Sequence, residues 1–436
     1  MKKVKDRFTK VEKSWMLYDL TLNGYATIVL TAIFPIYFNS VLGQNTLGLE
    51  MKGYASSLVM LVATVSSPIL GLLGDRKDMK KKFWGTFVII GVAFTVGLVF
   101  AQTWQLLLLF FVLSNICYNS AMLFNDSFIT DVTTPERMHR VSTWAFAIGY
   151  FGGGFILLVI TAVLLFTMGT SNVLPVKIAF ALTALWWLGF SIPMFLNVKQ
   201  VHYNEDSLGK EKKKIFSQLW QTIKSIAREK KIFYFMIAYF FYIDGVGTVI
   251  AMATSYGSTL NLSSALMIVA IITTQVVAIP FSILYGKLAN KFSAIRMIGI
   301  AIATYIVICV LGFYMGFIVE SSGAVGTAAN TAAIAKAQII FWIVAGLVGT
   351  AQGGIQALSR SQFGQMVPKD KSNEYFGFFN IFNRFASIMG SFLMAFVTML
   401  TGKSSFGLLS IIALFIVGGI MLLKSHRVKT LNINNT

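Results

Sequence analysis

Residues 14–38 read SWMLYDLTLNGYATIVLTAIFPIYF, an apolar stretch that is long enough to cross a lipid bilayer as a helix. The stretch nevertheless contains Asp19, Asn23 and Pro35. A carboxylate inside an apolar spanning helix costs several kcal/mol by most estimates unless it faces water or a polar partner. The stretch therefore indicates a membrane protein that uses some of its intramembrane polar groups.

The composition of the whole chain supports a membrane protein. Its 436 residues are 56% hydrophobic and only 12% charged, with a mean hydropathy of +0.72. A soluble domain has about a quarter of its residues charged, so a soluble protein is excluded. We predict an all-α integral membrane protein with twelve spanning helices, near residues 15–40, 53–73, 83–101, 104–128, 142–168, 175–196, 232–257, 263–286, 293–319, 337–358, 375–400 and 404–423.

The distribution of Lys and Arg predicts the orientation. Of 36 such residues, 31 fall in segments on one side of the predicted spans and four on the other. Because cytoplasmic loops are enriched in Lys and Arg, both termini and the central loop are expected in the cytoplasm. The net charge of +19 is then explained by topology and by attraction to anionic lipid headgroups, and no nucleic-acid binding is expected.

The longest polar segment divides the predicted spans six and six. We therefore expect an N-terminal bundle at residues 1–196, a basic cytoplasmic linker at 197–231 and a C-terminal bundle with a short tail at 232–436. The linker contains KEKKK at 210–214, followed by IFSQLWQTIKSIAREKK, an amphipathic piece suited to lie along the membrane surface.

The two halves of the chain show a weak repeat. GLLGDRKDMKKKF at residues 71–83 corresponds to GKLANKFSAIRM at 286–297, and Tyr18-Asp19 in the first span corresponds to Tyr242-Ile243-Asp244 in the seventh. Repeats of this kind indicate a transporter built from two pseudo-equivalent bundles, with its binding site near the midplane between them.

The first of these motifs resembles the signature of the major facilitator superfamily, G-x-x-x-D-R-x-x-x-K-K. The resemblance implies two six-helix bundles that work by alternating access, with Asp75 and Arg76 bonding neighbouring helix ends on the cytoplasmic side. Residues 15–38, 131–154 and 353–384 further resemble the branch of the fungal vacuolar amino-acid effluxer of autophagy and its bacterial relatives. That branch implies export of a small polar solute, such as an amino acid, by a monomer in a bacterial plasma membrane.

Polar residues within the predicted spans are the candidates for substrate binding. Asp244 lies about 18 Å and Arg384 about 14 Å into their helices at 1.5 Å per residue, close to the middle of the bilayer. Arg384 is suited to hold a carboxylate or phosphate, and Asp244 an amine or a proton. The alternative is a structural ion pair between these two residues. The candidate substrate ligands are Asp244, Arg384, Asn380, Asn383, Asn115, Asn119, Gln275, Gln352 and Gln356.

Proton coupling, if present, requires a carboxylate, because all three histidines lie in predicted cytoplasmic segments. Asp244 is the first candidate and Asp19 the second, although Asp19 is shallow enough to serve instead in a cytoplasmic network of helix ends. The candidates for the cytoplasmic gate are Gly71, Asp75, Arg76, Asp131, Arg137, Gly286, Asn290, Lys291 and Arg360.

The sequence contains no phosphate-binding loop, metal-ligand cluster or Ser-His-Asp arrangement in its spans, so we expect neither an enzyme nor a cofactor or metal. Two alternatives to a solute transporter remain. One is a drug or lipid-headgroup exporter, which a mostly aromatic cavity would favour. The other is a non-transporting membrane scaffold that recruits acidic partners through residues 197–231.

Overall fold

A computed structural model describes residues 7–42, 46–168, 173–205, 215–323, 326–385 and 388–428. Every regular element in these ranges is a helix, which confirms the all-α class. The predicted twelve spanning segments are also confirmed, because twelve helical segments are long and apolar enough to cross a membrane. They are Lys10–Pro35, Glu50–Gly74, Met79–Phe100, Trp104–Val132, Pro135–Met168, Val173–Asn197, Lys230–Thr259, Val269–Phe292, Ala294–Glu320, Ala328–Met366, Lys369–Thr401 and Ser404–Arg427.

The chain forms two compact units. Unit 1 comprises Met1–Thr222 and Val367–Asn380, and unit 2 comprises Ile223–Met366 and Ile381–Thr436. The segment 367–380, although late in the sequence, therefore packs with the first half of the chain. The predicted bundle boundaries at residues 196 and 232 stay predictions.

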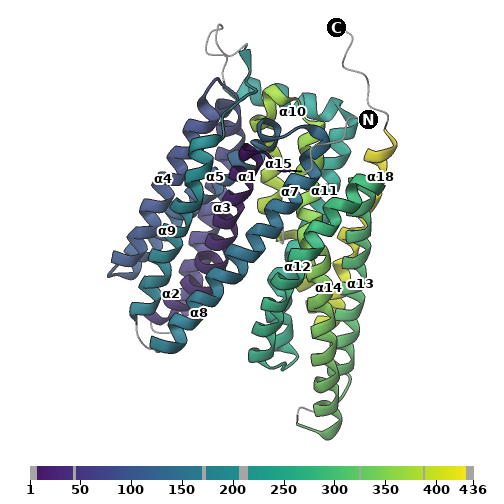
Figure 1. Ribbon diagram of the computed structural model, residues 1–436. Coiled ribbons are helices and arrows are strands. Elements are labelled where there is room, and N and C mark those ends of the chain that lie inside the picture. The colour runs from purple at the N-terminus through teal and green to yellow at the C-terminus, as the bar shows by residue number, and fades with distance from the viewer. Residues whose placement is uncertain are drawn as a thin grey trace. The chain divides into compact units, whose positions relative to one another are not determined.

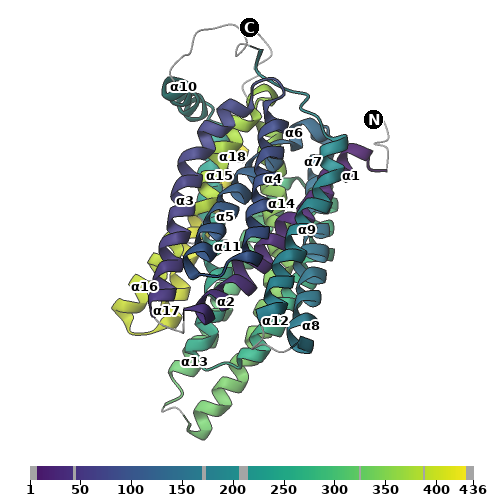
Figure 2. The same ribbon diagram turned by 90° about the vertical axis from the view of Figure 1, so that its left-hand side faces the viewer.

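Unit 1 is a set of helices in which α4 packs against α5 and α9, while α1 packs against α7 and α9 (Figures 1 and 2). Its elements are α1 (Lys10–Tyr25), the π-helix η1 (Ala26–Ala32), α2 (Ile33–Val41), α3 (Thr46–Gly74), α4 (Met79–Phe100), α5 (Trp104–Ser127), α6 (Ile129–Val132), α7 (Pro135–Gly149), the π-helix η2 (Tyr150–Ile156), α8 (Leu157–Met168) and α9 (Val173–Asn197).

In unit 2, α14 packs against α12 and α13, and α11 packs against α18. Its helices are α11 (Lys230–Thr259), α12 (Ser264–Phe292), α13 (Ala294–Glu320), α14 (Ala328–Met366), α16 (Ile388–Thr401), α17 (Ser404–Ser410) and α18 (Ile412–Arg427). Two helices cross the boundary between the units, α10 (Ile215–Arg228) and α15 (Ser372–Phe385), and the 3₁₀ turn η4 (Lys369–Lys371) precedes α15. The amphipathic piece of the linker is thus helical, while KEKKK at 210–214 lies outside the described residues.

The two π-helical segments lie in the first and fifth spans, and η2 of the fifth span packs against α1. Glycine is required at this contact, because a Cβ on Gly153 would lie 2.3 Å from the Gly24 nitrogen and 2.4 Å from the Leu20 carbonyl oxygen. Backbone therefore packs directly against backbone, the kind of approach that small residues permit in membrane bundles. Tyr118 on α5 donates to the Leu22 carbonyl oxygen at 3.1 Å, which ties α5 to the residues just before η1.

Two helices in the last third of the chain begin at a carboxylate supplied by an earlier segment. Asp75 accepts bonds from the start of α15, and Glu320 from Ser404 and Ser405 at the start of α17. First-turn N–H groups have no partner within their own helix, and the helix N-terminus has a partial positive charge. Each carboxylate satisfies both requirements.

Candidate functional site

The motif after α3 contains a buried carboxylate that accepts three hydrogen bonds from the start of α15. Asp75 Oδ1 accepts from the backbone N–H and the side-chain amide of Asn373, at 2.9 and 2.8 Å, and Oδ2 accepts from the Glu374 N–H at 2.9 Å. We call this set of bonds the Asp75 cap. Asp75 is only 3% exposed, and this burial raises its pKa to about 7 although Lys80 and the N–H donors lower it. A Cβ on Gly71 would lie 2.4 Å from the Asn373 carbonyl oxygen, so glycine is needed there.

Lys80 is the buried cation of the same motif, a role that the sequence pattern did not assign to it. Its ammonium group donates to Asp131 Oδ2 at 2.7 Å and to the Ser372 hydroxyl at 2.9 Å, and Lys80 is fully buried. Asp131 Oδ1 in turn accepts from the backbone N–H of His202 at 2.8 Å. Arg76, which we expected to bond a neighbouring helix end, is exposed instead.

Arg137 and Glu12 form a second ionic contact in unit 1. The guanidinium group of Arg137 donates from Nε to Glu12 Oε1 at 2.7 Å and from Nη2 to Oε2 at 2.8 Å. Glu12 also completes a capping box with Thr9 at the start of α1. This bidentate pair ties the start of α1 to α7, and the gate role predicted for Arg137 stays a prediction.

The corresponding motif of the second half has a different environment. Gly286 is buried in α12, but Asn290 and Lys291 are exposed near the end of that helix. Asn290 is therefore not a structural equivalent of the buried Asp75, although the sequence repeat aligns them. Arg360 is 4% exposed within α14. Roles of these four residues in a gate stay predictions.

Asp244 is fully buried in α11 and accepts hydrogen bonds from backbone N–H groups of α16. Its Oδ1 accepts from the Gly390 N–H at 2.7 Å, and its Oδ2 from the Met389 N–H at 3.1 Å. The hydroxyl of Thr248, one turn along α11, also donates to Oδ1 at 3.4 Å. This contact was not among the two roles that we considered, a substrate ligand or an ion pair with Arg384.

The other predicted ligands of the eleventh span share one face of α15. Asn380 is 3% exposed, whereas Asn383 and Arg384 in the last turn are half-buried. In α5, the Asn119 side-chain amide donates to the backbone and side-chain oxygens of Asn115, both at 2.8 Å. Substrate binding by any of these residues stays a prediction.

Asp19 is 2% exposed in α1, and its Oδ1 accepts from the Asn125 side chain on α5 at 3.2 Å. A buried bond to a neighbouring span agrees with the alternative that we left open, a network that joins helix ends.

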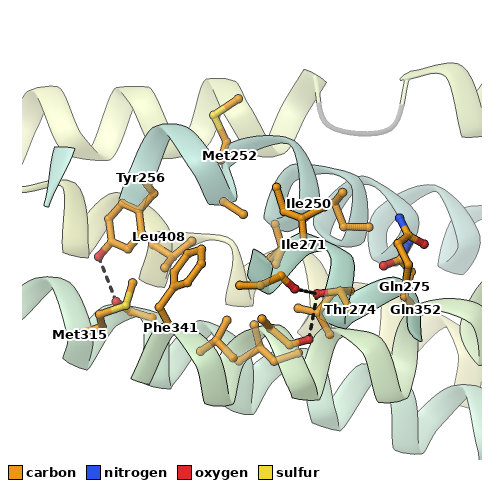
Figure 3. A pocket seen from close by; sticks show the side chains of 18 residues that line it. Ile250, Met252, Tyr256, Ile271, Thr274, Gln275, Met315, Phe341, Gln352 and Leu408 are labelled. Atoms are coloured by element: carbon orange, nitrogen blue, oxygen red, sulfur yellow. Dashed lines mark hydrogen bonds between the residues drawn. The ribbon is translucent and has the colours of Figure 1, made fainter. Parts of the chain in front are cut away.

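Unit 2 contains a cavity of about 110 Å³ between α11, α12, α13, α14 and α17 (Figure 3). Most of the 18 side chains that line it are aliphatic, and Tyr256 and Phe341 are its aromatic members. The Tyr256 hydroxyl lies at one end and donates to the Gly312 carbonyl oxygen at 2.9 Å. The amides of Gln275 and Gln352, two of the predicted ligands, lie together at the opposite end.

Gln275 contributes to this cavity a buried side-chain oxygen, Oε1, that has no hydrogen-bond partner among the described residues. A buried acceptor without a donor costs about 1–3 kcal/mol, so a bound N–H or O–H group would be favourable here. Gln356 lies one turn along α14 from Gln352 and is not one of the lining residues.

Comparison with known proteins identifies the family. A family model described as "Vacuole effluxer Atg22 like" matches residues 51–134 and 130–431. The chain belongs to the Atg22-like effluxer family. It is 41% identical to the MFS-type transporter YxiO of Bacillus subtilis (strain 168), over 95% of both chains. It is 23% identical to autophagy-related protein 22 of Vanderwaltozyma polyspora, over 82% of this chain and 73% of that protein.

Solved structures give the fold of this Atg22-like protein. The proton:xylose symporter XylE superposes with a TM-score of 0.70 at 12% identity, over 95% of both chains. The fucose transporter FucP, described as being in the outward conformation, gives 0.70 at 13% identity, over 96% of this chain and 98% of its own. Together with the 41% identity to an MFS-type transporter, this shows that the Atg22-like chain is a major facilitator superfamily transporter, a multi-pass membrane protein that moves a small molecule and is not an enzyme.

Proposed function

We propose that this protein exports a small neutral amino acid with an aliphatic side chain from the cytoplasm by alternating access, coupled to protons. The observation that supports this proposal most strongly is the cavity of unit 2. An engineered cavity of about 150 Å³ holds a benzene molecule, so a cavity of about 110 Å³ is suited to a group the size of an isobutyl chain.

The two ends of the cavity suit an amphiphilic solute. A glutamine amide can accept a bond from an ammonium group and donate one to a carboxylate, so Gln275 and Gln352 together match the polar part of an amino acid. The aliphatic lining matches its side chain. A drug or lipid-headgroup exporter is less well supported, because only two of the lining side chains are aromatic. Arg384 remains our candidate for the carboxylate at another stage of transport.

We also propose the orientation, the membrane and the oligomeric state of the protein. The bias of Lys and Arg towards one side supports cytoplasmic termini, and the similarity to a Bacillus protein supports the plasma membrane of a bacterium. We propose that the chain works as a monomer.

Thermal stabilisation of the purified protein across a panel of amino acids tests the ligand class. A ligand at a hundred times its dissociation constant stabilises the folded state by about 2.7 kcal/mol. We expect a higher melting temperature with leucine-like amino acids and no change with sugars. Gln275→Leu should remove the response. Gln362→Leu, on α14 but outside the cavity lining, should keep it.

Transport in proteoliposomes tests direction and coupling. We expect flux of the stabilising amino acid that depends on an imposed pH gradient. Flux that does not depend on the pH gradient would refute proton coupling. If no amino acid stabilises the protein or is transported, amino acids are refuted as its substrates. If the protein moves no solute at all, the alternative of a non-transporting membrane scaffold is favoured.

A further inference from the structure

Helix α10, labelled in Figure 2, presents a separate apolar surface. Phe216, Trp220 and Ile223 are 78%, 58% and 41% exposed. Their spacing of i, i+4 and i+7 places them on one side of the helix. Large apolar side chains that are exposed together on one helix face mark an interaction surface.

The charges beside this face indicate its partner. Lys224 and Arg228 are exposed and lie four residues apart, on the side of α10 adjacent to the apolar face. KEKKK immediately precedes the helix in sequence, and Lys230 and Lys231 follow it. An apolar face with basic residues at its margin is the pattern of a helix that lies in the headgroup region of an anionic bilayer. The twelve spans keep the chain in a bilayer, so this partner is always within reach.

The third side of α10 faces protein and connects it to the Asp75 cap. Thr222 is 7% exposed, and its hydroxyl donates to the carboxylate of Glu374 through a short hydrogen bond. Glu374 is itself 3% exposed. Its backbone N–H is one of the three donors to Asp75. A single residue in the first turn of α15 therefore bonds α10 through its side chain and Asp75 through its backbone.

We propose that α10 is an anionic-lipid-binding helix, and that its binding to acidic headgroups stabilises the Asp75 cap through Thr222 and Glu374. Lipid that fixes α10 also fixes Thr222, and a fixed Thr222 holds Glu374 in the position where its N–H reaches Asp75. The size of the response is limited by the difference in lipid affinity between the capped and uncapped states. This inference does not depend on which solute is transported.

Amide hydrogen exchange of the full-length protein in nanodiscs provides the test. The backbone amides of Asn373 and Glu374 donate to Asp75 in the cap, so their exchange rates report its opening. We expect slower exchange in discs of phosphatidylcholine with phosphatidylglycerol than in phosphatidylcholine alone. Each basic side chain near an anionic surface contributes about fivefold in binding, so Lys224→Gln with Arg228→Gln should reduce the difference up to roughly 25-fold.

A second set of variants separates lipid binding from its transmission. Thr222→Val should abolish the lipid effect on the two amides, and Thr222→Ser, which keeps the hydroxyl, should restore it. Ser217→Ala, an exposed position on the same helix, should respond as the wild type does. Equal exchange in neutral and anionic discs for the folded wild type would overturn the proposal and assign the α10 face to an acidic protein partner. A Thr222→Val variant with a full lipid response would overturn the proposed connection.

Discussion

The Asp75 cap makes a specific prediction about pH. Its carboxyl group is buried with a pKa of about 7, whereas an exposed aspartate in an open or unfolded chain has a pKa of 3.8. The capped state therefore binds a proton more readily than the uncapped state between these values. Proton binding favours the capped state fully below pH 4, and this contribution is lost as the pH rises through 7.

The magnitude follows from the size of the pKa difference. A shift of one pKa unit corresponds to about 1.4 kcal/mol, so a shift of three units corresponds to about 4 kcal/mol. Of this, about 2.5 kcal/mol is lost between pH 5 and pH 8, because most of the titration of the capped carboxyl falls in that interval. Unit 1 should therefore be measurably less stable at pH 8 than at pH 5.

Two aspartates in one loop allow a controlled measurement. The chain contains eight tryptophans, so intrinsic fluorescence reports thermal unfolding of the purified protein across this pH range. Asp75→Asn is neutral at every pH and should flatten the profile by about 2.5 kcal/mol. Asp78→Asn, at an exposed position in the same loop, should leave the wild-type profile unchanged. If Asp75→Asn and the wild type lose equal stability between pH 5 and 8, the assignment of this titration to Asp75 is refuted.

Three further variants test other contacts. Asp244→Ala leaves the Met389 and Gly390 amides buried without their acceptor and should lower stability by about 2–4 kcal/mol in the same assay. An unchanged melting temperature with loss of transport would instead assign Asp244 to the substrate. Gly153→Ala should reduce the yield of folded protein, because its Cβ would overlap α1 backbone, while Gly346→Ala, with open space around it, should express normally. Equal yields would contradict the close packing. Arg137→Lys should lose about 1–2 kcal/mol, because lysine cannot bind both oxygens of Glu12, and a wild-type melting temperature would show that the second bond is unimportant.

The overall architecture could be predicted from sequence because the bilayer imposes simple rules. A helix that crosses it needs about 20 apolar residues, and these runs are visible without knowledge of any contact. The GLLGDRKDMKKKF motif marked the position of the Asp75 cap for the same reason, since a cluster of charges between two apolar runs is conspicuous.

The partners of the charged groups could not be predicted in the same way. Depth in the helix correctly marked Asp244 as an intramembrane carboxylate, but its acceptor role depends on Met389 and Gly390, which lie 145 and 146 residues later. Lys80 is one of three consecutive lysines and is distinguished from them only by the packing that buries it. The exposed Arg76 shows the opposite error, because a motif position does not determine which side of a turn faces protein.

The cavity was predictable only in part. Gln275 and Gln352 stood out as polar residues in apolar helices, whereas the aliphatic side chains around them resemble any other lipid-facing or core positions in the sequence. The π-helical segments η1 and η2 had no signal that separated them from ordinary helix, apart from the three glycines of η2.

The three carboxylates that accept backbone N–H groups have a consequence for biosynthesis. Asp75 precedes its partner Asn373 by 298 residues, Asp244 precedes Gly390 by 146, and Glu320 precedes Ser405 by 85. Because a chain emerges from the ribosome N-terminus first, each acceptor is already made when the helix that needs it is translated. The last spans thus complete sites that earlier segments have prepared. A C-terminal fragment made alone would lack Asp75 and would start α15 without its acceptor, whereas a truncated N-terminal fragment would expose a buried carboxylate to quality-control proteases.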